Sequence, residues 1–397
     1  MSVSQGREFL SIPGPTNVPD EVLAAMHRPA IDIYSGEMIG ITDSCLADLA
    51  GIFRTKGRTY IYAANGHGGW EAALTNVLSR GELVLALESG RFATGWGEMA
   101  SMLGVEVEVL KGDWRRAVDP AALEERLRKD KAHLIKAILV VQIDTASGVV
   151  NDIPAMRKAL DAAKHPALLM VDTISSLASI DYRHDEWGVD VTVGGSQKGL
   201  MLPPGLSFNA ISDKALTAAR EAKMPRSYWA WDEMLAAGKL GFFPYTPATN
   251  LLYGLRESLR MLDEEGLDNV FARHARHSEA TRRAVRAWGL EVFCLNPDEY
   301  SHSLTAVLCP PQHDADKIRQ VILERFDMSL GTGLGKVQGK VFRIGHLGDF
   351  NDLMLAGTLC GVEMGLQLAG VPLRGSGVGA ALEYLGTAAM APHLPVA

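Results

Sequence analysis

Two polar residues that could do chemistry together follow neighbouring apolar runs in the middle of the chain. Asp172 comes directly after Ala167–Val171, and Lys198 stands 26 residues later, in a glycine-rich turn after Val189–Val193. If both runs are strands of one parallel sheet, they end at the edge where ligands of such sheets bind. A pyridoxal phosphate site requires these two groups: the lysine amine forms a Schiff base with the cofactor aldehyde, and the carboxylate keeps the pyridine nitrogen protonated.

Each of these features has a simpler explanation when it is taken alone. Asp172 could be a helix N-cap, and Lys198 could be a solvated loop lysine. The turn Gly66–Trp70, which follows Tyr60–Ala64, could be only a tight strand-to-helix connection, although its free N–H groups and the helix dipole could also hold a phosphate. The ordered combination of turn, carboxylate and lysine favours the cofactor site. A third apolar run ends at the same expected edge and is followed by Asp144–Gly148.

The segment from about residue 44 to 212 contains the elements that must position these residues. Short apolar runs rich in β-branched residues alternate there with amphipathic stretches of helical period. Asp119 before Pro120 and Asp152 before Ile153-Pro154 are helix-start signals. The alternation favours an α/β fold with a mostly parallel sheet covered by helices on both faces. We expect strands at Glu82–Glu88, Val105–Lys111, Ile135–Ile143, Ala167–Ile174, Val189–Gly194 and Leu206–Ser212, and helices at Ser44–Thr55, His67–Ser79, Ala93–Leu103, Asp119–Asp130 and Asp152–Lys164.

The sequence changes character from Leu251 onward. Leu251–Leu290 contains almost no turn residues and interleaves Arg, Glu and His with a leucine and alanine stripe, which predicts one or two long helices. The remainder predicts a smaller α+β domain. We therefore divide the chain into an N-terminal arm (1–20), a large cofactor-binding domain (21–255) and a small C-terminal domain (256–397). In the small domain we expect strands at Leu290–Leu295, Ser303–Cys309 and Lys340–Leu347, and helices at Asp314–Phe326 and Asp352–Leu368.

Composition excludes several classes of protein. The chain has 397 residues, enough for two or three domains, so a small disulfide-stapled fold is excluded. Its 39 basic and 47 acidic residues give a net charge of −8, which does not favour nucleic-acid binding. Four widely spaced cysteines form no CxxC pair, as expected of buried free thiols, and we expect no metal site. No signal peptide and no long apolar run is evident, so we expect a cytoplasmic protein without membrane spans.

These residues resemble the class V aminotransferase group of fold-type I pyridoxal phosphate enzymes. The resemblance is most specific in Gly195–Lys198 with the upstream Asp172, and in Phe342–Gly348. Asp185–Asp190 and Gly375–Val378 are more similar to the serine–glyoxylate branch than to the animal alanine–glyoxylate enzymes. The resemblance implies a large domain with a mostly parallel seven-stranded sheet and a smaller C-terminal α+β domain. It extends over nearly the whole chain, through Ile12–Asn17, Tyr245–Pro247, Leu252–Arg256 and Asn269–Arg276.

The resemblance also implies the roles of individual residues. Lys198 is then the Schiff-base lysine, Asp172 partners the pyridine nitrogen and Arg343 binds the substrate α-carboxylate, a task that suits a planar guanidinium. Thr246 implies a homodimer, because in the family this residue reaches the phosphate of the partner subunit. The other implied cofactor contacts are Asn65, Gly66 and His67 in the phosphate turn, Phe92 stacked over the ring, Thr145 near the phenolic oxygen, with Ser147 as its alternative, and Gln197.

The sequence departs from the family pattern at two positions. Asn65 stands where relatives have Ser or Thr, which leaves its own phosphate contact open. Phe243 stands three residues before Thr246, where some relatives have Tyr, and Tyr245 could supply the missing hydroxyl.

The implied reaction is transfer of an amino group from an amino acid to a 2-oxo acid. We expect L-serine and glyoxylate as substrates, giving hydroxypyruvate and glycine. Alanine and aspartate remain open as donors, pyruvate as acceptor, and Arg28, Arg91 or His346 as a second carboxylate anchor. A cofactor-dependent lyase, which would need a reactive cysteine or different anchors, and a binding protein that has lost activity are the alternatives from other functional classes.

Overall fold

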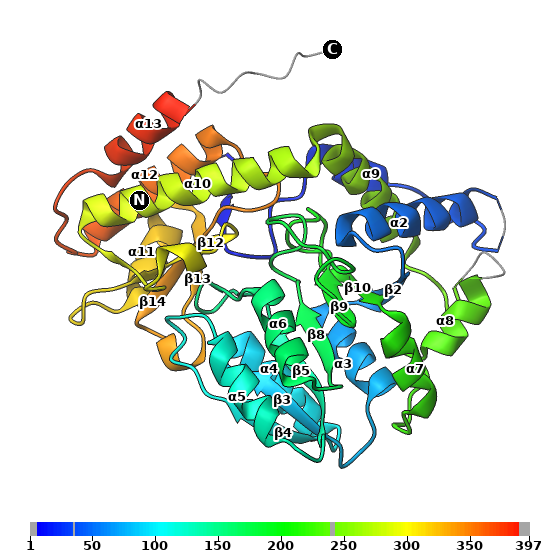
Figure 1. Ribbon diagram of the computed structural model, residues 1–397. Coiled ribbons are helices and arrows are strands. Elements are labelled where there is room, and N and C mark those ends of the chain that lie inside the picture. Colours follow the sequence, from blue (N-terminus) through cyan, green and yellow to red (C-terminus); the bar gives the residue numbers. More distant parts are fainter. Residues whose placement is uncertain (1–5, 35, 239–242, 389–397) are drawn as a thin grey trace.

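Two large β-sheets with their covering helices, and one two-stranded hairpin, make up the described part of the chain in the computed structural model (Figure 1). The structure describes residues 6–34, 36–238 and 243–388. The larger sheet occupies the blue to green part of the chain, and the smaller sheet lies at the side of the molecule where the yellow and orange elements gather. Both sheets contribute to the site described below.

The larger sheet has seven strands, as the resemblance implies, and only β10 runs antiparallel to its neighbours. Adjacent residues of its buried strands point to opposite faces: Leu85 and Leu87 pack on one side, and Val84 and Ala86 on the other. In spatial order the strands are β2 (Arg58–Ala64), β10 (Gly205–Ile211), β9 (Val191–Gly195), β8 (Leu168–Asp172), β5 (Ile135–Val141), β3 (Leu83–Leu87) and β4 (Glu106–Leu110).

Helices cover both faces of this sheet, which explains why its strands are almost continuously apolar. On one face lie α3 (Gly66–Val77), α4 (Arg91–Met102) and α7 (Asp213–Glu221). On the other lie α2 (Glu37–Phe53), α5 (Pro120–Lys129), α6 (Ile153–Ala163) and α9 (Thr249–Glu265). The predicted helix starts are confirmed, because the Asp119 side chain accepts from the Ala121 amide at 2.9 Å and Asp152 from the Ala155 amide at 2.9 Å. The remaining helices of this part are α1 (Asp20–Met26) and α8 (Trp231–Gly238).

The smaller sheet has five strands and is built around the C-terminal part of the chain. The N-terminal strand β1 (Phe9–Ser11), which lies in the segment expected to be an arm, pairs with β13 in this sheet. In spatial order the strands are β1, β13 (Met328–Thr332), β14 (Val341–Gly345), β12 (Leu304–Leu308) and β11 (Glu291–Val292). The helices packed with it are α10 (Leu267–Trp288), α11 (Ala315–Phe326), α12 (Asp352–Leu368) and α13 (Gly377–Ala388).

Several elements of the described chain were not predicted by the apolar pattern: the strands β1 and β13 and the helices α1, α7, α8 and α13. Strand β1 has only three residues, and β13 contains Ser and Gly, so neither gives a clear strand signal. The stretch expected to hold one or two long helices forms two, α9 and α10, which meet at Gly266 with φ of 76°. Three short elements lie at the junction of the sheets: the hairpin β6 (Ile143–Asp144) and β7 (Val149–Val150), and the 3₁₀ turns Pro297–Glu299 and Gly335–Val337.

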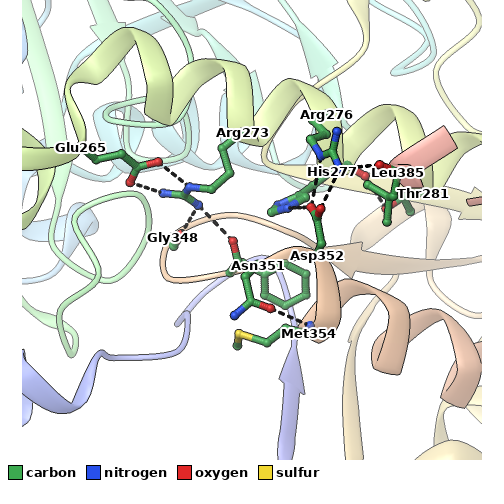
Figure 2. A network of polar contacts seen from close by, with 11 residues as sticks. Glu265, Arg273, Arg276, His277, Thr281, Gly348, Asn351, Asp352, Met354 and Leu385 are labelled. Carbon is green, nitrogen blue, oxygen red and sulfur yellow. Dashed lines mark hydrogen bonds and ion pairs between the residues drawn. The ribbon is translucent and has the colours of Figure 1, made fainter. Parts of the chain in front are cut away.

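A polar network ties α10 to the segment that follows β14 (Figure 2). Arg273 donates to the Gly348 carbonyl at 2.9 Å and is held by Glu265. Arg276 and His277 both contact the Asp352 carboxylate, at 2.7 and 3.0 Å, at the start of α12. These contacts fix the loop between β14 and α12, which lies against the backbone of the site lysine.

No helix in the part of the chain that the structure describes combines the length and apolarity needed to span a membrane.

Candidate active site

A cavity of about 270 Å³ collects eight of the ten predicted site residues. It lies at the carboxyl ends of β5, β8 and β9, the edge where the sequence places the chemistry. The eight residues come from loops, helix starts and the end of strand β8, which are far apart in the sequence. They are Asn65, Gly66, His67, Phe92, Thr145, Asp172, Gln197 and Lys198.

Asp172, the last residue of β8, is almost completely buried at the floor of this cavity. Its carboxylate accepts hydrogen bonds from the Trp70 indole at 2.8 Å and from the Ile174 amide at 2.7 Å. Burial raises the pKa of Asp172 to about 7, and these two donors oppose that rise. A positively charged group in the cavity would restore the charge of the carboxylate.

Lys198 lies three residues after β9 and is also buried. Its Nζ donates to the carbonyl of Pro13, in the N-terminal segment. Burial and, to a smaller extent, the positive charge of Arg343 lower the pKa of this amine to about 7. Gly14 makes room for the lysine: a Cβ there would lie 2.5 Å from Cδ and Cε of Lys198, and the φ of Gly14 is +118°.

The turn Asn65–His67 begins helix α3 beside the cavity. The Asn65 side chain caps this helix, accepting from the amides of His67 at 3.1 Å and Gly68 at 3.4 Å. Asn65 therefore performs a capping task that the family's Ser or Thr can also perform. A Cβ on Gly66 would come within 2.2 Å of Ile174, so only glycine allows this close approach.

Phe92, Thr145 and Gln197 complete the wall of the cavity. Phe92 lies in the first turn of α4, with its ring edge-on to Trp70 at a centroid distance of 6.3 Å. Thr145 lines the cavity, whereas the alternative Ser147 points away and donates to the Ser89 carbonyl at 2.9 Å. The side-chain oxygen of Gln197 is buried and has no hydrogen-bond partner among the described residues. Such an unpaired atom in a cavity wall indicates a polar ligand.

Arg343 is at the edge of the site, on β14 of the smaller sheet. Its Nε donates to the Thr332 carbonyl at 2.7 Å and one Nη1 hydrogen to the Thr145 carbonyl at 2.8 Å. Burial lowers its pKa to about 10, so it stays charged at neutral pH. Within the described residues no partner is found for its Nη2, which leaves hydrogens for a carboxylate.

Thr246 does not line the cavity either and, unlike Arg343, has no hydrogen bond to any described residue that does. It is exposed and lines a separate small cavity together with Tyr62, Phe243 and Tyr245. Tyr245 stacks on Tyr228 at 4.9 Å and lies 3.3 Å from the Ser227 hydroxyl.

Sequence reasoning assigned no individual role to three parts of the site. Trp70 holds Asp172, and the N-terminal residues Pro13 and Gly14 contact Lys198. The Asp144 carboxylate also lies in the site region, because it accepts hydrogen bonds from the Phe92 amide. Asp144 was detectable as an acidic residue after an apolar strand, but nothing in the sequence connects the other residues to their partners.

Comparison with known proteins identifies the family. The sequence profile described as aminotransferase class-V matches residues 9–334. The chain belongs to the class V aminotransferase family. It is an aminotransferase that depends on pyridoxal phosphate, and the resemblance found in the sequence is confirmed.

Two curated members of the class V family are similar to the chain over almost its entire length. It is 47% identical to serine–glyoxylate aminotransferase from Methylorubrum extorquens, with 96% of both chains covered. It is 44% identical to L-aspartate–glyoxylate aminotransferase from Paracoccus denitrificans, with 94% of this chain and 95% of that one covered. Among solved structures, ureidoglycine–glyoxylate aminotransferase from Bacillus subtilis matches with a TM-score of 0.89 at 26% identity, covering 97% of this chain and 100% of that one. The fold is therefore the fold-type I architecture.

The cavity fits pyridoxal phosphate. The cofactor needs an amine for its aldehyde, a carboxylate for its ring nitrogen and donors for its phosphate. Lys198 and Asp172 supply the first two, and the start of α3 faces the same space. Among the described residues, Asp172 is hydrogen-bonded only to neutral donors, and the Gln197 oxygen has no donor; the cationic ring nitrogen of the cofactor would suit Asp172.

Proposed function

We propose that the chain transfers the amino group of L-serine to glyoxylate, giving hydroxypyruvate and glycine. The single observation that supports this most strongly is the 47% identity with a serine–glyoxylate aminotransferase over 96% of both chains. The cavity supports it independently, because it places an amine, a carboxylate and a nearby guanidinium around one small space.

We assign the chemical roles as follows. Bound pyridoxal phosphate supplies an aldehyde and a cationic ring that stabilises negative charge developing at the substrate α-carbon. The Lys198 amine holds the cofactor and then, when free, moves the proton at the α-carbon as general base and acid. Its lowered pKa, about 7, makes a neutral amine available at physiological pH. Asp172 would hold the ring nitrogen in its charged form, and the indole of Trp70 holds that carboxylate in place.

The remaining assignments concern binding. Arg343 anchors the α-carboxylate of both substrates through its free N–H groups. The Phe92 ring limits tilting of the cofactor. The other cofactor contacts are assigned to Asn65, Gly66 and His67 for the phosphate, and to Thr145 and Gln197 for the polar edge of the ring.

The surroundings of the cavity favour serine over aspartate as the amino donor. Aspartate would need a second cationic anchor for its side-chain carboxylate, and Arg28, Arg91 and His346 were the candidates. Arg28 lies over the Tyr253 ring, Arg91 pairs with Glu98 at 2.8 Å, and His346 is buried; none of the three lines the cavity of its own chain. L-Aspartate remains the second candidate donor, because the relative from Paracoccus denitrificans is named L-aspartate–glyoxylate aminotransferase.

A cysteine-dependent lyase is not supported by the cysteine positions. Cys45, Cys294 and Cys309 are buried, and burial raises the pKa of all three thiols. None of the chain's cysteines lines the cavity, Cys360 on α12 included.

We further propose a homodimer with shared sites in the cytoplasm. Thr246 is exposed and lies outside the cavity of its own chain, which supports a role at the phosphate of the partner subunit. Whether Phe243 or Tyr245 takes the place of the family's tyrosine there depends on the same interface. We retain residues 1–20, 21–255 and 256–397 as arm, large domain and small domain.

An absorbance titration tests the substrate assignment. L-Serine should bleach the visible band of the bound cofactor, and glyoxylate should restore it. L-Alanine and L-aspartate, added in separate titrations, rank the donors. Lys198→Ala should show neither change, whereas Lys214→Ala, at the opposite edge of the sheet, should behave as wild type. Bleaching by aspartate but not by serine would replace the serine assignment, and no response to any donor would refute the transaminase role of Lys198.

A further inference from the structure

Asp144 is a completely buried carboxylate that bonds three backbone amides around the candidate site. Its Oδ2 accepts from the amides of Phe92 and Ala93, both at 2.9 Å, and its Oδ1 accepts from the amide of Ala146 at 3.0 Å. The first two amides are free N–H groups at the start of α4, where a negative charge also interacts favourably with the helix dipole. Asp144 therefore caps α4 from another part of the chain.

The three amides belong to segments that carry assigned binding residues. The start of α4 carries Phe92, and the turn after Asp144 carries Thr145. The Thr145 carbonyl in turn accepts from Arg343 at 2.8 Å, which links this turn to the smaller sheet. The Asp144 side chain thus links the segments that carry Phe92 and Thr145 and, through Thr145, the residue Arg343.

The backbone of Gly90 packs directly against the Asp144 carboxyl group. A Cβ on Gly90 would lie 2.1 Å from Cγ of Asp144 and within 2.5 Å of both its oxygens. Because Gly90 has an extended backbone, with φ of 176°, the glycine is needed for this close approach rather than for its conformation.

The donors around Asp144 favour a charged carboxylate. Both oxygens accept from N–H groups, so an amide nitrogen in place of either oxygen would set one N–H group against another. Burial raises the pKa of Asp144, while the three amides and the charge of Arg343 oppose that rise. For Arg343, no hydrogen-bonded carboxylate is present among the described residues, and Asp144 is the negative charge that favours its protonated form.

We propose that Asp144 is a positioning residue of the aminotransferase site. It fixes Phe92 and Thr145 relative to each other and, through the Thr145 carbonyl and its own charge, holds Arg343 in the orientation that leaves Nη2 for a substrate carboxylate. The inference rests on the proposed function, because it takes the roles of Phe92, Thr145 and Arg343 from there.

The test compares Asp144→Asn with Asp190→Asn in the cofactor-loaded enzyme. Asp190 is an equally polar control: it is 5% exposed and accepts from the Leu169 amide and the Ser212 hydroxyl, at 2.9 and 3.0 Å, at the opposite edge of the same sheet. Three quantities are measured besides turnover. They are the dissociation constant of pyridoxal phosphate, the dissociation constant of glycolate and the melting temperature. Glycolate is a short carboxylate without an amino group, and its binding is followed by the visible absorbance of the cofactor.

Asp144→Asn should weaken binding of both the cofactor and glycolate at least about tenfold, the effect of losing one hydrogen bond to a charged group. The KM of L-serine and of glyoxylate should rise by a similar factor, and kcat should change less, because Lys198 and Asp172 are untouched. Asp190→Asn should lower the melting temperature and leave both dissociation constants within about twofold of wild type.

Gly90→Ala provides a second variant, in which the added methyl group would displace the Asp144 carboxylate without changing its chemistry. It should reproduce the losses of cofactor and glycolate affinity even if Asp144→Asn is too unstable to purify. The proposal is overturned if either folded variant loses only thermal stability and keeps both dissociation constants. A wild-type enzyme that binds cofactor and glycolate but transfers no amino group from serine would refute the substrate assignment and leave this comparison intact.

Discussion

The amine of Lys198 should titrate near neutral pH in the cofactor-free protein. Burial and the charge of Arg343 lower its pKa from 10.5 to about 7, while Asp172 and Asp144 act in the opposite direction. At pH 7 about half of this amine is then neutral, against roughly one part in three thousand for an ordinary lysine. The structure therefore predicts about a thousandfold more reactive amine at Lys198 than at an exposed lysine.

Reductive methylation with formaldehyde over a series of pH values measures this titration directly. Peptide mass spectrometry gives the extent of reaction at Lys198 and at the exposed Lys129. The midpoint of the pH profile, rather than the absolute rate, reports the pKa. We expect a midpoint near 7 for Lys198.

Two substitutions should move this midpoint in opposite directions. Arg343→Gln removes a positive neighbour and should raise the pKa of Lys198, because the charged amine is then less disfavoured. Asp172→Asn removes a negative neighbour and should lower it. A Lys198 profile that coincides with that of Lys129, or shifts of the reverse sign, would refute the burial argument.

Two further predictions concern the carboxylate anchor and acid stability. Arg343→Lys should raise the KM of donor and acceptor by about 10- to 100-fold in steady-state assays. The reason is that an ammonium group cannot bond the Thr145 and Thr332 carbonyls and also bind a carboxylate in a plane. An unchanged KM would place the anchor elsewhere. Burial lowers the pKa of His184 from 6.5 to about 4, so its contribution to stability is present above pH 6.5 and is lost as the pH falls toward 4. Between pH 7 and pH 5, the unfolding free energy of His184→Asn should therefore fall by about 2 kcal/mol less than that of wild type, as measured by urea titration. The exposed His133→Asn is the control. An equal fall in His184→Asn and wild type would contradict this prediction.

The central part of the fold could be predicted from the sequence because its signals are local. The strands that end at Asp172 and before Lys198 are apolar runs bounded by turns, and their order along the chain indicates parallel pairing. Strand β13 escaped prediction for a physical reason. It begins one residue after the left-handed Asp327 that ends α11, so no turn separates the two elements, and its sequence contains Ser and Gly.

The candidate site could be predicted only in part, since its contacts are long-range. Trp70 and Asp172 are 102 residues apart, and no pattern in either segment indicates the hydrogen bond between them. Arg343 was assigned through family resemblance, because an arginine in a strand could equally pair with a structural carboxylate. The structure gives the physical reason for its placement: it bonds carbonyls of Thr145 and Thr332, one from each side of the junction between the sheets.

The N-terminal segment makes the two sheets interdependent at the reacting amine. Strand β1 pairs with β13 of the smaller sheet, and two residues later the Pro13 carbonyl accepts the hydrogen bond from Lys198. The Thr16 amide and hydroxyl then bond the carbonyls of Gln197, at 3.1 Å, and Lys198, at 3.1 Å. The lysine is therefore held from one side by the end of β9 and from the other by a strand of the sheet that carries Arg343. The amine and the carboxylate anchor therefore share a support, because the segment that bonds Lys198 continues a strand of the sheet that carries Arg343.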